Sequence, residues 1–281
     1  MRHKLFSYRH GFRDFNPEEI LEINRKNMTP ELRTRLENLI IKTLHSLKEH
    51  NFYIWEEIIN HIWDAFLHKH LLFTPNLTGI IQEIEKMPWY KIYNLLEFMY
   101  ISFQEHSIMG FSVFLESELN KILEEEFAPY RMIEGLIIPI SDDEEIKTVK
   151  ETFENLDRFH PAKEHLKKAL KLLSNRESPD YVNSIKESIS ALESLANLIL
   201  GTSGKSLTAI HQKLCSELKC PKPIEMQIKL FYDWVSKEEG IRHGKVHEKT
   251  TIGQSEAKLI FIQICGLINY LITKLSEKGI R

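Results

Sequence analysis

Residues 180–200 have the sequence DYVNSIKESISALESLANLIL, and this stretch decides the fold class of the chain. Its apolar residues recur every three or four positions, at Ile185, Ile189, Leu192, Leu195 and Ile199. Gly201-Thr202-Ser203-Gly204 then ends the pattern. The stretch therefore predicts a long amphipathic helix with one buried face.

The sequence on both sides of this helix predicts a bundle. A helix over 161–174 precedes it, a short helix covers 207–218, and two more run over 221–239 and from an N-cap at Ser255 to about Glu277. Phe159-His160-Pro161 breaks the helix before them. We therefore predict a C-terminal domain over residues 159–281, built as a four-helix bundle with the short helix added between its second and third main helices.

Residues 1–158 are predicted to form a separate N-terminal helical domain. Asn16-Pro17 and Thr29-Pro30 are helix starts, and apolar-periodic segments follow at about 32–47, 54–70, 76–86, 89–104 and 111–127. Residues 130–140 are rich in β-branched side chains and turn at Glu134-Gly135, which predicts a small β-hairpin. A capping pattern at residues 141–144 opens a last helix, to about Asp157. The expected fold class is all-α with one hairpin.

Composition excludes several classes of protein. With 281 residues, 42% hydrophobic and 27% charged, the chain has the make-up of a globular protein of two domains. A net charge of -3 gives no global basic field, so any contact with RNA must come from a local patch. The many aromatic residues between 52 and 100 are interpreted as helical core, because a base-stacking platform would need exposed rings beside basic residues.

The sequence favours a cytoplasmic protein with no membrane partner. Residues 1–10 contain no apolar run of the kind found in secretory signals. The apolar stretch Leu259–Leu275 is interrupted by polar residues and is interpreted as a buried helix. Cys215, Cys220 and Cys265 have neither disulfide-framework nor zinc-ribbon spacing, so we interpret them as reduced packing residues.

The residues best suited to chemistry lie in Gly240–Glu248, GIRHGKVHE. Arg242 offers a planar, permanently charged fork for a phosphate, and His247 titrates near neutral pH. On a regular helix the two would lie about 140° apart, but the neighbouring glycines favour a loop or a frayed helix end, from which both could converge. RNA supplies its own nucleophile, the 2′-hydroxyl, so Arg and His could promote cleavage without a metal. A second histidine is then expected, from His243 or from a second copy of the chain.

Other interpretations of this segment stay open. Arg242 could cap the preceding helix, because cations favour a helix C-terminus. His243 and His247 lie four residues apart and could form a metal pair on a helix, although no third ligand is evident nearby. The stretch could also be a solvated basic loop.

Two glutamates of the preceding helix are further candidates. Glu187 and Glu193 could orient the Arg or His across the bundle, or could be solvated charges. Gly201–Ser206 ends in Gly-Lys-Ser but follows a helix and lacks the first glycine of a phosphate loop, so it is interpreted as a turn.

Arg242-His243-Gly244-Lys245-Val246-His247 resembles the R-x4-6-H motif of the HEPN superfamily, and residues 184–195 resemble the second helix of HEPN domains in abortive-infection proteins. Residues 27–36 and 130–145 resemble the N-terminal domain of AbiJ-type phage-defence proteins. The matches lie in both predicted domains. Many relatives carry Asn where this chain has His243.

This resemblance implies a metal-independent endoribonuclease without cofactors, usually a homodimer formed through the C-terminal domain. Arg242 would bind the scissile phosphate, His247 would be the general base or acid, and His243 would orient Arg242 or touch RNA. Lys245, Glu187 and Glu193 are the other residues expected to bind or orient the substrate. A phage-derived trigger or a cognate inhibitor is the other expected partner.

A different class of function is compatible with the same residues. Some HEPN domains only bind nucleotides or partners, so the chain could be a non-catalytic RNA-binding, nucleotide-binding or antitoxin-type module. Toxicity of the expressed protein, lost on replacement of Arg242, would distinguish the enzyme from the binding module.

Overall fold

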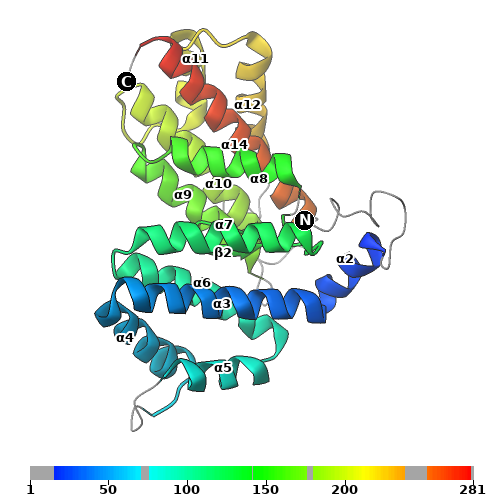
Figure 1. The fold of residues 1–281 in the computed structure, drawn as a ribbon. Coiled ribbons are helices and arrows are strands. Elements are labelled where there is room, and N and C mark those ends of the chain that lie inside the picture. Colours follow the sequence, from blue (N-terminus) through cyan, green and yellow to red (C-terminus); the bar gives the residue numbers. More distant parts are fainter. Residues whose placement is uncertain (1–15, 71–75, 141, 176–179, 238–251, 280–281) are drawn as a thin grey trace. The chain divides into compact units, whose positions relative to one another are not determined.

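The computed structural model describes residues 16–70, 76–140, 142–175, 180–237 and 252–279 (Figure 1). These residues are mostly helical with one antiparallel hairpin, which confirms the predicted fold class. Contacts within the chain define two compact units, Met1–Ser141 and Asp142–Arg281. The predicted domain limits of 1–158 and 159–281 differ from this division by one helix, and they remain a prediction.

The first four described α-helices of this unit begin at residues whose side chains cap them. Asn16 Oδ1 accepts the backbone N–H of Glu18 at 3.1 Å, and Thr29 Oγ1 accepts that of Leu32 at 3.4 Å. The elements are α2 (Pro17–Lys26), α3 (Pro30–His50), α4 (Phe52–His61), a π-helical turn η2 (Ile62–Phe66), α5 (Leu77–Lys86), α6 (Trp89–Glu105) and α7 (Met109–Glu125).

The core of the first unit is built around α3. Leucines and isoleucines along this helix are fully buried, and α3 contacts α4, α5, α6 and α7. The rings of Trp55 and Tyr93 lie in this core as the sequence predicts. The prediction is wrong for Phe52, Tyr53 and Tyr90, which are 51%, 81% and 49% exposed. Burial of such rings supplies much of the apolar area that stabilises a helical domain.

The predicted hairpin is confirmed. Strands β1 (Arg131–Ile133) and β2 (Leu136–Ile138) pair antiparallel, with Ile133 opposite Leu136. Glu134 and Gly135 both have positive φ, 52° and 78°, as a two-residue type I′ turn requires. The side chain of Asn120 on α7 makes two 2.7 Å hydrogen bonds with the backbone of Met132 and fixes the hairpin to that helix.

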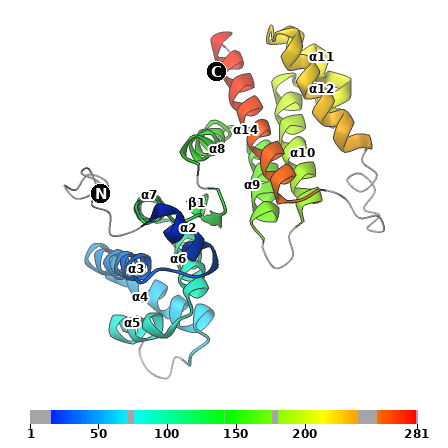
Figure 2. The same cartoon turned by 90° about the vertical axis from the view of Figure 1, so that its right-hand side faces the viewer.

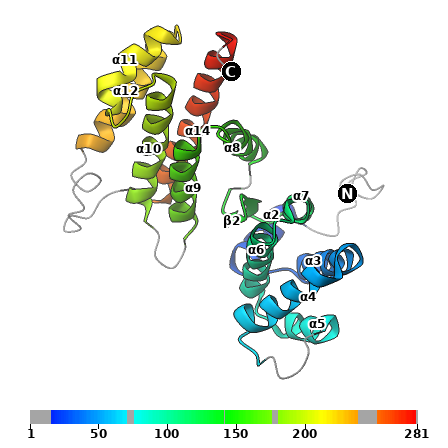
Figure 3. The same cartoon turned by 90° about the vertical axis from the view of Figure 1, so that its left-hand side faces the viewer.

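The second unit contains the helices predicted for the C-terminal domain and also the helix predicted to end the N-terminal domain. Its elements are α8 (Asp143–Asn155), α9 (His160–Ser174), α10 (Tyr181–Ile199), α11 (Leu207–Glu217), α12 (Lys222–Lys237) and α14 (Gln254–Glu277) (Figures 2 and 3). The Ser184 hydroxyl donates to the carbonyl of Ala169 at 2.9 Å and fixes the register of α10 on α9. Helix α8 packs against α14, where the Thr152 hydroxyl donates to the Cys265 carbonyl at 3.3 Å.

Helix α14 is apolar over most of its length. By length and composition it could cross a membrane, and half of its apolar window is buried within the unit. It contacts α8, α9 and α10, in agreement with the predicted buried helix. Its N-cap is Gly253 rather than Ser255, because the Glu256 carboxylate accepts the backbone N–H of Gly253 at 2.8 Å. A cytoplasmic location stays a prediction.

Candidate functional site

The predicted Arg-x4-His site lies outside the described residues. Arg242, His243, Lys245 and His247 all fall within 238–251, so their convergence stays a prediction. The structure does describe the two helices to which this segment is joined, since α12 ends at Lys237 and α14 begins at Gln254.

The ends of these two helices lie at one end of the second unit. Figures 2 and 3 show α10 and α14 running in one direction and α9 and α12 in the other. The C-terminal ends of α9 and α12 therefore lie at the same end of the unit as the N-terminal ends of α10 and α14. Glu187 is the seventh residue of α10 and lies about 9 Å along the helix axis from this end.

Glu187 is a mostly buried carboxylate held by two bases of α9. Its side chain is 12% exposed, with one oxygen 2.7 Å from His165 Nδ1 and the other 2.5 Å from Lys168 Nζ. Burial is the largest influence on its pKa and acts to raise it, but the hydrogen bonds from Lys168 and His165 outweigh burial and leave the pKa below its usual value. Glu187 is therefore a charged carboxylate that orients a histidine.

His165 was not among the residues predicted from the sequence. It lies one turn before Lys168 on the exposed side of α9, and its side chain is 43% exposed. A spacing of 22 residues from Glu187 carries no signal by itself. The contact follows from the register of α10 on α9, which becomes evident only when the Ser184 to Ala169 hydrogen bond is known.

Glu193 has a different position and a local structural role. Its Oε2 accepts the backbone N–H of Leu207 at 2.8 Å, at the first residue of α11, where the N-cap Ser206 makes no side-chain capping bond. One turn further along α10, Asn197 hydrogen bonds to Thr202 and to the backbone of Lys205. Glu193 and Asn197 thus tie the loop after α10 to that helix, and the structure does not bring Glu193 to the His165–Glu187 pair among the contacts it describes.

The stretch Gly201–Ser206 is a turn, as predicted. Gly201 and Gly204 have φ of 62° and 63°, which glycine adopts without strain. Within the described ranges, no group of three or more His, Cys, Asp or Glu side chains could hold a metal ion. The alternative of a metal pair at His243 and His247 falls on residues outside those ranges.

Comparison with known proteins identifies the first half of the chain. The family described as AbiJ N-terminal domain 4 matches residues 4–155, which is more than half of the 281 residues and includes α2 to α8. Comparisons with curated proteins and with solved structures found no match. By its sequence from residue 4 to residue 155, the chain belongs to the AbiJ N-terminal domain 4 family, which is of the abortive-infection type.

Proposed function

We propose that this protein is a metal-independent endoribonuclease of the HEPN type that acts in abortive infection. One observation carries the proposal. The Arg242-to-His247 sequence joins the last two helices of a helical bundle, in a chain whose first half belongs to an abortive-infection family. The second unit would cut RNA, and the first would sense a trigger or bind an inhibitor.

The proposed chemistry is transfer of the phosphodiester to the adjacent 2′-hydroxyl. His247 takes the proton of the 2′-hydroxyl or gives one to the leaving 5′-oxygen, and Arg242 stabilises the charge that develops on the phosphate. His243 orients Arg242, and Lys245 contributes to binding of the RNA backbone. The product ends are a 2′,3′-cyclic phosphate and a 5′-hydroxyl.

Two proton transfers require a second group. We propose that it comes from His243 or from a second copy of the chain in a homodimer formed through the second unit. The charged cluster of Glu187, His165 and Lys168 supports the proposal, because it holds a charged carboxylate against a partly exposed histidine on α9 and α10 of the same unit.

The test is RNA cleavage by purified full-length protein. We expect His247→Ala to lower the cleavage rate by about 10²–10⁴-fold, the usual contribution of a general acid or base. Arg242→Lys keeps the charge but loses the planar fork and should also be strongly impaired. His160→Ala is the matched control, because His160 is an exposed histidine in the same unit, at the first residue of α9. Full activity in His247→Ala would refute the assignment.

Two further measurements separate this proposal from its alternatives. EDTA should leave cleavage unchanged, whereas inhibition reversed by zinc would favour a metal pair at His243 and His247. Expression of the wild-type chain should be toxic and expression of Arg242→Ala harmless. Equal behaviour of both, together with no cleavage of any RNA, would favour a non-catalytic binding module.

A further inference from the structure

The turn between α11 and α12 places two cysteines at paired positions. Helix α11 ends at Glu217 with Leu218 as its C-cap, and Lys219 follows with φ of 53°. The N–H of Cys220 donates to the carbonyl of Cys215 at 2.8 Å, and the N–H of Lys219 donates to that of Ser216 at 3.3 Å. These two bonds and the left-handed residue between them define a Schellman motif.

In a Schellman motif the residue two beyond the C-cap packs against the residue three before it. Those two positions are usually apolar. Here they are Cys220 and Cys215, so the turn brings together two thiols that are five residues apart in the sequence. The two thiols interact directly, and that interaction follows burial among the causes that raise the pKa of Cys215 to about 12.

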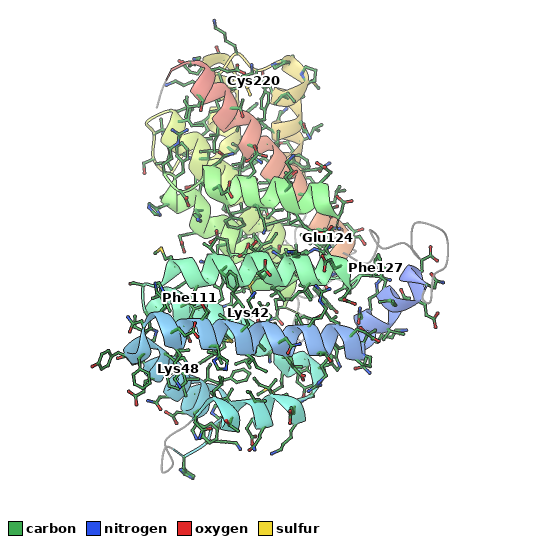
Figure 4. All side chains as sticks on the ribbon, viewed as in Figure 1. Lys42, Lys48, Phe111, Glu124, Phe127 and Cys220 are labelled. Carbon is green, nitrogen blue, oxygen red and sulfur yellow. The ribbon has the colours of Figure 1, made fainter. Side chains whose placement is uncertain are left out.

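The two thiols differ in exposure. Cys215 is 2% exposed, whereas Cys220 is only partly buried (Figure 4 labels Cys220 in the turn after α11). The Tyr270 hydroxyl on α14 also interacts with Cys220, and burial followed by that contact raises the pKa of Tyr270. Of the two thiols, Cys220 is therefore the more accessible to an oxidant in solvent, and Cys215 lies next to it in the buried position.

We propose that Cys215 and Cys220 form a redox-modification site that closes to a disulfide when a hydroperoxide oxidises Cys220. The Cys220 sulfur gives up its proton and attacks one oxygen of hydrogen peroxide, the O–O bond breaks, and a sulfenic acid forms while the released hydroxide takes up the proton as a first water. Cys215 sulfur then attacks the sulfenic sulfur, the S–O bond breaks, and water leaves with the Cys215 proton. Two thiols are oxidised by two electrons, and one peroxide is reduced to water. A disulfide requires Cα atoms about 4.4–6.8 Å apart. The 2.8 Å hydrogen bond from the Cys220 N–H to the Cys215 carbonyl brings the two backbones together at this turn.

The experiment uses reduced full-length protein treated with hydrogen peroxide and digested with trypsin without reductant. Lys219 lies between the two cysteines, so cleavage after it separates their peptides unless a disulfide links them. We expect a linked pair of residues 214–219 and 220–229, an intact mass lower by two hydrogens, and loss of two of the three titratable thiols. Reduction should restore all three.

The variants make the proposal falsifiable. Cys220→Ser should form no linked peptide and retain two free thiols. The matched control Cys265→Ser removes the fully buried thiol of α14 and should form the linked peptide like the wild type. Accumulation of Cys220 sulfinic acid with Cys215 still free would overturn the proposal, as would a disulfide to Cys265 or between two chains. None of these outcomes depends on cleavage of RNA.

Discussion

Glu97 on α6 of the first unit and Glu187 on α10 of the second are both largely buried glutamates, and the two have opposite surroundings. Glu97 on α6 accepts the backbone N–H of Ile137 at 2.6 Å, and burial raises its pKa in spite of that bond. Glu187 on α10 faces Lys168 and His165, which lower its pKa against the effect of burial. Burial therefore favours the neutral form of Glu97, whereas Lys168 and His165 favour the charged form of Glu187.

The opposite pKa directions indicate different roles, a structural one for Glu97 and one compatible with chemistry for Glu187. Glu97 ties the hairpin to α6, and a neutral acceptor can do this equally well. Glu187 keeps a charge beside an exposed imidazole, an arrangement that fixes the orientation of a histidine. In the second unit, Glu187, His165 and Lys168 thus combine a charged carboxylate, a histidine and a lysine in one cluster.

The two carboxylates give stability opposite dependences on pH. The folded pKa of Glu97 is raised, so its contribution to stability is complete below the unfolded value and is lost as pH rises through the folded value. The folded pKa of Glu187 is lowered, so its contribution is complete above the unfolded value and is lost as pH falls through the folded value.

The largest expected effect concerns the hairpin that Glu97 anchors. In Gly135→Ala the new Cβ would overlap the ring of Tyr100, at a residue with φ of 78° that disfavours any L side chain. We expect a loss of roughly 3 kcal/mol in the free energy of unfolding, from the strained φ and the steric overlap together. Urea unfolding followed by circular dichroism measures it.

A matched glycine of the second unit provides the control. Gly201 has φ of 62°, but a Cβ there would meet nothing within 4 Å. Gly201→Ala should therefore lower the free energy of unfolding by about 1–2 kcal/mol, from the strained backbone conformation alone. Equal losses in the two variants would show that the contact with Tyr100 does not hold the hairpin in place.

The second prediction removes the charged carboxylate of the second unit. Glu187→Ala leaves His165 and Lys168 without their shared partner, but both side chains are partly exposed and can hydrogen bond to water instead. We therefore expect the free energy of unfolding to fall by about 1–2 kcal/mol at pH 7. Because the wild type loses this contribution when Glu187 is protonated, the difference between the two proteins should shrink as pH falls through the folded pKa. Thermal unfolding across that pH range tests it, and a difference that stays constant with pH would contradict the assigned cause.

Local signals in the sequence predicted the elements well. Asn16 and Thr29 each precede a proline at the start of a helix, and their side-chain oxygens accept backbone N–H groups of the first turn. Glu134-Gly135 forms the hairpin turn, where glycine adopts a positive φ without strain. The helix predicted over 54–70 is different. In the structure the α-helix ends at His61, a π-helical turn follows over Ile62–Phe66, and no helix continues to residue 70. Apolar periodicity could not predict this, because it does not reveal an extra residue in a helical turn.

Contacts between distant helices could not be predicted in the same way. The partners of Glu187 depend on the register of α9 and α10, and α8 packs on α14 through Thr152 and a hydrogen bond between Asn155 and Asn269 at 3.1 Å. These pairs lie 19 to 114 residues apart, where no spacing rule applies. The Arg242 and His247 site came from a short motif alone and stays a prediction.

The last prediction, with the smallest expected change in stability, replaces the carboxylate of Glu97 by an amide. Glu97→Gln keeps an oxygen that can accept the Ile137 N–H and removes the group that burial disfavours when charged. We expect stability at neutral pH to be unchanged or higher by less than about 1 kcal/mol, because the variant lacks the desolvation cost of the carboxylate. Above the folded pKa of Glu97 the variant should be the more stable protein, and towards acidic pH the two should converge. The same change at the other position, Glu187→Gln, should have the opposite sign at pH 7. Two glutamine variants that shift the urea midpoint in the same direction would mean that the surroundings of the two carboxylates do not determine their charge.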